Sequence, residues 1–227
     1  GTEVTPFATI WDHAEHKKYS VSGSNVYPSL ALLDPTLTLT LPEEETLNTG
    51  LDACSHALES LWNHNRSPIS IAFAMQALAG LVKALPRILL RPDDLSARAR
   101  MQESSLLAGL AISHTRTAIA HGISYPLTSH LGIPHGLACS FTLPQLLVWS
   151  LPSLVADGLD EGILNRTLAM LHSLRLDSRM AMYATPAQVL ALQDEMITKG
   201  RSENFRYALP GDVNALLGQS LKGLHRG

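Results

Sequence analysis

The sequence predicts a mainly α-helical fold with a small β portion at its N-terminus, and three observations support this prediction. From Pro42 onward, apolar residues recur at three- and four-residue steps, which is the period of a helix with one buried face. Before that point the chain has short runs of β-prone residues instead. No glycine-rich phosphate loop and no repeated βαβ unit is recognisable, so we predict no dinucleotide-binding domain within these residues.

The β portion is expected to be a hairpin followed by one further strand. Residues 7–11 and 19–21 are β-prone runs separated by a polar stretch, which is typical of two strands joined by a turn. Residues 29–33 could form a third strand, because Asp34 and Pro35 after them favour a turn.

Helices are expected to begin where three glutamates follow Pro42. Acidic residues in a first turn suit the positive end of the helix dipole. Pro86 predicts a kink or a break inside its helix, and Pro186 and Pro210 are expected to divide the C-terminal part, beyond Asp157, into shorter helices. The apolar-periodic segments are residues 47–61, 69–90, 95–112, 117–131 and 135–154.

Composition indicates a globular protein and narrows the classes of partner. Of the 227 residues, 45% are hydrophobic and 16% are charged, which is typical of a packed domain. The net charge of -3 leaves no basic field, so we expect neither nucleic acid nor a membrane as a partner. Cys54 and Cys139 do not form a CxxC pair, and no signal-like segment opens the given sequence. We therefore expect reduced, inert thiols and a cytoplasmic location.

The chemistry-bearing residues include a large number of histidines, ten in this chain. Asp52 and His56 are four residues apart in a predicted helix, which places both side chains on one face. His121 lies in another predicted helix, and His135 follows the Gly-Ile-Pro break before the next one. Taken alone, an Asp-x3-His pair is more often a hydrogen-bonded couple than a metal site. Three imidazoles and one carboxylate together, however, suit Fe²⁺ or Zn²⁺ better than Ca²⁺ or Mg²⁺.

Three segments resemble, in the same order, the metal-binding segments of the iron-containing (group III) alcohol dehydrogenases. They are GLDACSHALE at residues 50–59, AHGISYPL at 120–127 and GIPHG at 132–136. Residues 1–7 and 33–38 also resemble stretches of that family, and the resemblance becomes weaker after about Trp149. The resemblance implies one divalent metal, Fe²⁺ or Zn²⁺, bound by Asp52, His56, His121 and His135.

The resemblance also implies a fold and a domain organisation. The fold would be the bundle-like helical catalytic domain of the dehydroquinate synthase-like type, with the small β portion before it. Residues 1–41 would be the trailing strands of an N-terminal nucleotide-binding domain, and residues 42–227 the all-α metal-binding domain. We expect a homodimer by resemblance alone.

The activity implied is hydride transfer between a small alcohol or aldehyde and NAD(H) or NADP(H), and the chain need not be active by itself. The resemblance places Lys18 near the cofactor. Tyr125 stands where most members have a second histidine, so either the proton leaves by another path or Tyr125 shapes the substrate pocket. Residues 123–130 also look like a subgroup that reduces phosphonate-bearing aldehydes.

Two other functions are compatible with the same residues. A metal-dependent hydrolase could use the same four ligands to activate water, with Glu59 as the carboxylate base. A catalytically inactive helical remnant could serve in assembly alone. Glu59 lies one turn beyond His56, and in the dehydrogenase it could instead orient a ligand imidazole. His130 is the other histidine that could approach a substrate.

Overall fold

The computed structural model describes residues 1–12, 17–197, 202–207 and 212–222, and within them it confirms the mainly helical prediction. Strands β1 (Phe7–Asp12) and β2 (Lys17–Ser22) form an antiparallel hairpin, as expected from the two β-prone runs. The prediction of a third strand at residues 29–33 is wrong. That segment is irregular, with Leu30 and Leu32 84% and 90% exposed, because no described strand lies beside it to complete a ladder.

Four short 3₁₀ helices and eleven α-helices complete the described residues. The 3₁₀ helices are η1 (Thr2–Val4), η2 (Ser24–Val26), η3 (Pro35–Thr38) and η4 (Ser202–Asn204). The longer α-helices are α1 (Glu43–Leu61), α2 (Pro68–Leu90), α3 (Leu95–Thr115), α4 (Ile119–Leu131), α6 (Leu143–Ala156) and α7 (Glu161–Ser173). The shorter ones are α5 (His135–Ala138), α8 (Leu176–Met180), α9 (Pro186–Leu190), α10 (Gln193–Met196) and α11 (Val213–Ser220).

Most helix boundaries lie where the sequence predicted them, with two differences. The helix α1 begins after Pro42, as predicted. The helix α2 continues through Pro86, because its apolar face packs along α1 and α3. Pro186 begins α9, a short helix separate from α8, as predicted, and Pro210 lies outside the described residues. The segment 135–154 forms two helices, α5 and α6, because the chain turns between them.

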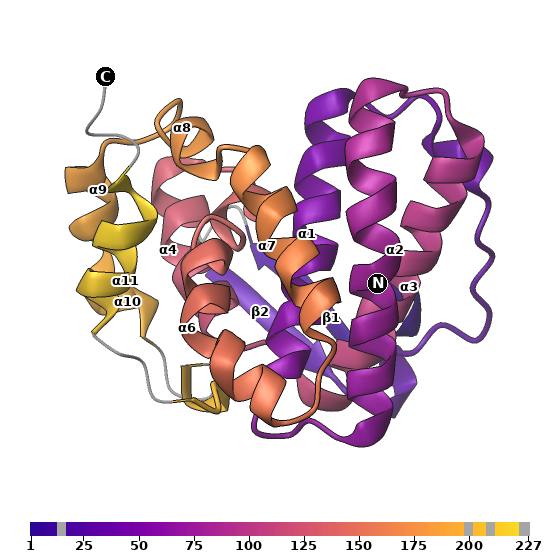
Figure 1. The fold of residues 1–227 in the computed structure, drawn as a ribbon, viewed down its shortest axis with the longest axis horizontal. Coiled ribbons are helices and arrows are strands. Elements are labelled where there is room, and N and C mark those ends of the chain that lie inside the picture. Colours follow the sequence, from indigo (N-terminus) through magenta and orange to yellow (C-terminus); the bar gives the residue numbers. More distant parts are fainter. Residues whose placement is uncertain (13–16, 198–201, 208–211, 223–227) are drawn as a thin grey trace.

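Two groups of helices lie side by side, and α1 joins them. The long helices α1, α2 and α3 pack against one another, and α1 also contacts α4, α5 and α6 of the second group. Figure 1 shows the three long helices on one side, the later helices on the other, and the hairpin crossing behind them. Because α1 carries both Asp52 and His56, the site lies where the two groups meet.

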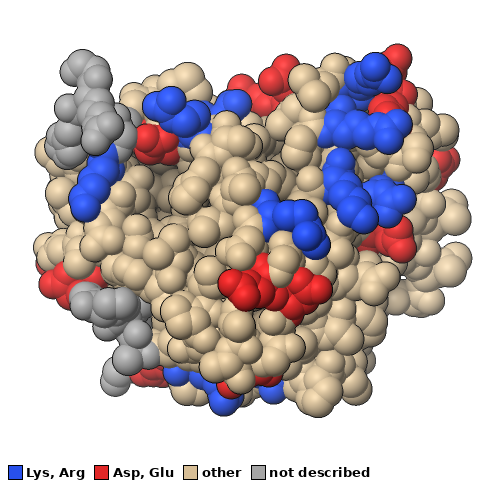
Figure 2. All heavy atoms as spheres, viewed as in Figure 1, with Lys and Arg blue, Asp and Glu red and all other residues tan. Residues whose placement is uncertain are grey.

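Helix α2 is the described helix that is long and apolar enough to cross a membrane by length and composition. Its residues Ala74, Leu78, Leu81 and Leu85 are buried in the protein core. Of its most apolar 18-residue window, 39% is buried, and the helix packs against α1 and α3. On the face drawn in Figure 2, basic and acidic side chains are interspersed among uncharged ones, as expected from the small net charge.

A close contact between α1 and α5 fixes the entry of His135 into the site. A Cβ atom added to Gly136 would lie 1.9 Å from the backbone oxygen of Asn48 and 2.5 Å from its carbonyl carbon. Two backbones cannot approach this closely if a side chain stands between them. Gly136 therefore allows α5 to pack directly on α1.

We predict that Gly136→Ala lowers the free energy of unfolding by about 3 kcal/mol, because backbone must move to accept the methyl group. The melting temperature should fall by about 6–12 °C. Gly218→Ala in α11 is the matched control, since nothing lies within 4 Å of a Cβ atom there. That variant should melt at or above the temperature of the unchanged chain. Equal melting of the two variants would contradict the close contact.

Candidate metal centre

The first two candidate ligands lie one turn apart on α1, as their spacing predicted. The side-chain atoms His56 Nε2 and Asp52 Oδ1 are 3.5 Å apart. The helix therefore presents one nitrogen and one oxygen donor on the same face. Asp52 keeps 29% of its side chain exposed and His56 keeps 17%, so both remain accessible from the solvent side.

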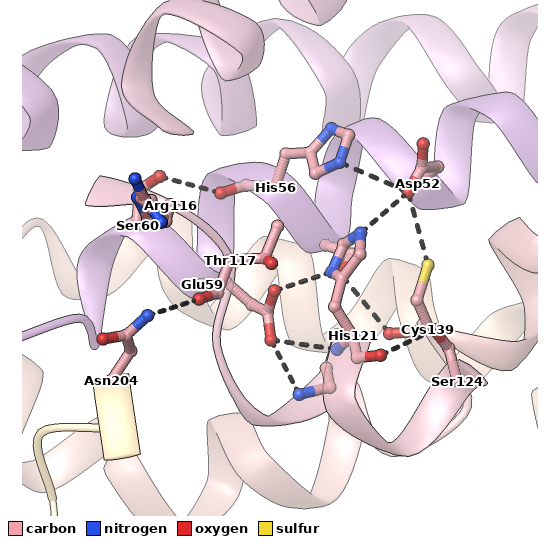
Figure 3. Close-up of polar contacts among 12 residues, drawn as sticks. Asp52, His56, Glu59, Ser60, Arg116, Thr117, His121, Ser124, Cys139 and Asn204 are labelled. Carbon is pink, nitrogen blue, oxygen red and sulfur yellow. Dashed lines mark hydrogen bonds and ion pairs between the residues drawn. The ribbon is translucent and has the colours of Figure 1, made fainter. Parts of the chain in front are cut away.

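The other two candidates approach the same carboxylate from different helices. His121 lies in the first turn of α4, and His135 is the first residue of α5. Their Nε2 atoms lie 3.4 Å and 3.8 Å from Asp52 Oδ1. The structure thus brings together the four residues that the sequence singled out, with three imidazole nitrogens around one carboxylate oxygen. Figure 3 shows His56 and His121 pointing toward Asp52.

His121 is held by a buried carboxylate. Its Nδ1 atom lies 2.6 Å from Glu59 Oε2, and the Glu59 side chain has no exposed surface. The other oxygen of Glu59 accepts the backbone N–H groups of Ala120 and His121 at 2.7 Å and 3.2 Å. This one carboxylate therefore fixes both the start of α4 and the orientation of the His121 ring (Figure 3).

The Glu59 contact also determines which nitrogen of His121 is available. A carboxylate can only accept hydrogen bonds, so Nδ1 must carry the hydrogen, and Nε2 of the neutral ring then carries a lone pair. That Nε2 atom is buried and makes no hydrogen bond within the described residues, while Asp52 Oδ1 lies 3.4 Å away. Two acceptors that face each other need a cation between them, so these residues fit a divalent metal.

The pKa values of the cluster also indicate that a positive charge is needed between His121 and Asp52. Burial opposes protonation of His121, but Glu59 and Asp52 outweigh it and raise the pKa of His121 to about 9. Burial also opposes ionisation of Asp52, yet the neighbouring imidazoles hold its pKa below the ordinary value. Burial lowers the pKa of His56 to about 4. At neutral pH the metal-free cluster therefore holds a proton on His121, where a metal ion could replace it.

Cys139 is a further potential donor in this cluster. The possible ligand atoms of Asp52, His121, His135 and Cys139 all lie within 4.8 Å of one another. The Cys139 thiol donates to Asp52 Oδ1 at 3.4 Å, and burial and the nearby carboxylates raise its pKa well above the ordinary value. In the metal-free chain the thiol is therefore a hydrogen-bond donor to Asp52. We keep His56 as the fourth candidate ligand, because its Nε2 atom lies 3.5 Å from Asp52 Oδ1 on the same face of α1.

The cluster opens into a cavity of about 930 Å³. Asp52, His56, His121 and His135 line it, together with residues of the hairpin and of the segment between α3 and α4. Tyr125 also lines the cavity, one turn after His121, and its ring centroid lies 6.3 Å from that of His135. A small molecule entering this cavity would reach the three imidazoles and the phenol together.

The remaining predicted residues lie in different places. Lys18 belongs to β2, but its side chain lies outside the described part of the structure. His130 is half exposed and pairs with Glu195 at 3.0 Å, and it is not among the residues that line the cavity. Arg116, which no sequence pattern predicted as a site residue, does line it. Its distinguishing signal is a backbone conformation, with φ of 65°, that no residue spacing reveals.

Comparisons with known proteins show what the chain is similar to. A sequence model described as the Fe-containing alcohol dehydrogenase family, C-terminal, matches residues 46–192, which include all four candidate ligands. Over 147 residues the chain is 38% identical to a phosphonoacetaldehyde reductase of Streptomyces viridochromogenes, covering 65% of this chain and 37% of that protein. It is 35% identical to a 1-propanol dehydrogenase of Citrobacter freundii, covering 65% of this chain and 40% of that protein.

Solved structures extend the similarity to the fold. A sulfoacetaldehyde reductase from Bifidobacterium kashiwanohense, solved with NAD⁺, has a TM-score of 0.81 at 27% identity, over 99% of this chain and 61% of that one. An iron-containing alcohol dehydrogenase from Thermotoga maritima has a TM-score of 0.78 at 28% identity, over 98% of this chain and 61% of that one. The matches to the two curated relatives cover about two-fifths of the length of each.

We predict that Glu59→Gln weakens Zn²⁺ binding about 10- to 100-fold. The amide oxygen can still accept from the α4 backbone, but the amide N–H₂ would face His121 Nδ1 and favour the tautomer with hydrogen on Nε2. Zn²⁺ affinity would be measured by competition with a chelator, and melting of the metal-free chain would report on the fold. Glu45→Gln, at an exposed position of the same helix, is the control. An unchanged affinity would show that Glu59 does not position His121.

Proposed function

The chain belongs to the iron-containing alcohol dehydrogenase family, and we propose that it forms the metal-binding catalytic part of a dehydrogenase. The reaction is hydride transfer between NAD(P) and a small primary alcohol or aldehyde. One observation carries this proposal. Three imidazole nitrogens converge on Asp52 Oδ1 at the wall of a cavity large enough for a small substrate and part of a cofactor.

In this proposal Asp52, His56, His121 and His135 hold one divalent ion, Fe²⁺ or Zn²⁺. Asp52 supplies the negative charge, and its position among the imidazoles keeps it ionised. Glu59 is a positioning residue, because it acts on the site through the His121 ring. When bound, the ion supplies Lewis acidity toward an alcohol or carbonyl oxygen, and the nicotinamide supplies the redox chemistry.

The substrate side of the site is formed by this chain's own residues. Tyr125 lines the cavity beside His135, so its ring limits the space around the reacting carbon. We propose that shaping this pocket is the main role of Tyr125. A phenol has an ordinary pKa near 10 and is a poor proton carrier at neutral pH. The proton would then pass directly to solvent. Solvent reaches the cluster because 42% of the His135 side chain is exposed.

No observation favours the hydrolase alternative. That reaction needs a carboxylate that can approach a water molecule beside the metal. The Glu59 side chain is fully buried, its oxygens accept from α4 and from His121, and it does not line the cavity. Among the described residues that line the cavity, Asp52 is the one carboxylate, and it belongs to the metal cluster.

The cofactor and assembly belong to the same proposal. The NAD⁺ complex of the sulfoacetaldehyde reductase supports a nicotinamide cofactor, and the choice between NAD and NADP stays open. We propose that residues 1–41, with Lys18 on β2, are the trailing part of an N-terminal nucleotide-binding domain, and that residues 42–227 form the metal-binding domain. We also propose that the protein is a cytoplasmic homodimer. We propose no membrane and no nucleic acid as a partner.

The purified chain should bind one equivalent of Fe²⁺ or Zn²⁺. At a free metal concentration 100 times the Kd, binding adds about 2.7 kcal/mol to the free energy of unfolding. The melting temperature should then rise by about 5–10 °C. Asp52→Ala and His135→Ala should abolish both the metal content and this rise. His130→Ala, which leaves the cluster intact, should behave as the unchanged chain. The metal site is disproved if the alanine variants bind as much metal as the parent.

We predict that the natural protein consumes NADH or NADPH when a short aldehyde is added. The reaction would be monitored by the loss of absorbance of the reduced nicotinamide. Asp52→Ala should lower kcat/KM by at least about 100-fold, because the metal is then lost. Glu45→Gln should leave kcat/KM within about twofold. A metal-loaded protein that consumes neither cofactor with any aldehyde would contradict the reaction class while leaving the metal site intact.

A further inference from the structure

Arg116 has a backbone conformation that is energetically unfavourable for a residue other than glycine. Its φ of 65° and ψ of 176° lie in a region that is essentially restricted to glycine. The residue ends α3, its N–H group bonds to the carbonyl of Ile112 at 2.8 Å, and its carbonyl accepts from Asn63 Nδ2 at 3.2 Å. Strained residues held in this way concentrate at binding and catalytic sites. A glycine would be easier to accommodate here, so the side chain of Arg116 needs its own explanation.

Arg116 lies on the same cavity as the candidate ligands, and hydrogen bonds join its neighbour Thr115 to the helix that carries two of them. The neighbouring hydroxyl of Thr115 lies 3.1 Å from that of Ser60, and Ser60 donates to the carbonyl of His56 at 2.9 Å. The residue before Arg116 is therefore linked to α1 one helical turn after His56. Arg116 and the four candidate ligands line the same cavity.

The guanidinium group has an apolar support but no carboxylate partner among the described residues. It lies over the ring of Phe7, with 5.6 Å between the guanidinium carbon and the ring centroid. The carboxylate among the cavity-lining residues is Asp52, which the three imidazoles already surround. The cavity therefore presents a positioned cation, and an anionic group on a bound molecule could pair with it.

We propose that Arg116 binds the anionic group of the substrate. The substrate class is then a short aldehyde or alcohol with a phosphonate or sulfonate on a nearby carbon. A guanidinium fork matches two oxygens of such a tetrahedral group, and the apolar Phe7 ring beside it strengthens the pairing. Because Arg116 and the four candidate ligands line one cavity, a single short molecule can reach both. The inference rests on the proposed function, because the reacting carbon lies at the metal cluster.

Arg116→Gly is the direct test, because glycine adopts the observed φ without strain and should not weaken the fold. Arg175→Gly is a matched control, since Arg175 is the other non-glycine residue with positive φ among those described, at 49°. Arg175 does not line this cavity. Both variants should melt at or above the temperature of the unchanged chain, and both should bind the same amount of Zn²⁺.

Calorimetric titration would measure the affinity of four probes: 2-hydroxyethylphosphonate, 2-hydroxyethanesulfonate, 1-propanol and inorganic phosphate. Each titration would be done with Zn²⁺-loaded chain and with chain freed of metal by a chelator, to separate binding to Arg116 from binding to the ion. In both forms Arg116→Gly should weaken the binding of one or both hydroxyethyl anions about 10- to 100-fold. The affinity for 1-propanol should stay unchanged. Arg175→Gly should change none of them. The anion that binds more tightly identifies the head group of the substrate as a phosphonate or a sulfonate.

Three results would overturn the inference. The first is equal affinity of the Arg116→Gly and unchanged chains for both hydroxyethyl anions. The second is binding of inorganic phosphate as tight as that of the hydroxyethyl anions, which would mean a general anion site. The third is a loss, on Arg116→Gly, of NADH or NADPH affinity in the natural protein with no loss for the anions. If the unchanged chain binds no Zn²⁺, the proposed function fails separately.

Discussion

The site depends on one buried contact, between the Glu59 carboxylate on α1 and the Nδ1 atom of His121 on α4. The carboxylate has no exposed surface, so its charge is compensated by the His121 ring and by the hydrogen bonds that it accepts from the first turn of α4. These bonds orient the ring and leave its other nitrogen facing Asp52. A metal cluster at the junction of two helix groups requires such a link, since neither group alone positions all four donors.

Around that contact, α1 acts as the common support of the site. It carries Asp52 and His56 on one face and Glu59 one turn later, and its backbone at Asn48 receives Gly136 at the start of α5. The second group of helices therefore brings His121 and His135 to α1, which already carries Asp52 and His56. The cavity in front of the cluster is completed by the hairpin and by the segment between α3 and α4. Stability and function are coupled here, because the same helix packing buries the core and aligns the donors.

The sequence predicted the helices and the four donors, for different reasons. Apolar periodicity predicts α1 to α4 directly, and the four-residue step places Asp52 and His56 on one face. His121 and His135 are too far away in sequence for any spacing rule, so their selection depended on the family resemblance. The third strand was wrong, because a β-prone run needs a neighbouring strand that no local pattern supplies. Arg116 was missed, since its importance lies in its φ and its place in the cavity, which only the fold determines.

X-ray absorption spectroscopy of the Zn²⁺-loaded chain tests the central claim most directly, because it reports which atoms surround the ion. With Asp52, His56, His121 and His135 as ligands, the spectrum should show only nitrogen and oxygen neighbours at about 2.0–2.2 Å, with the outer-shell pattern of imidazole rings. A sulfur neighbour at about 2.3 Å would mean that Cys139 takes the place of a histidine. That result would contradict the donor set and the role given to the thiol.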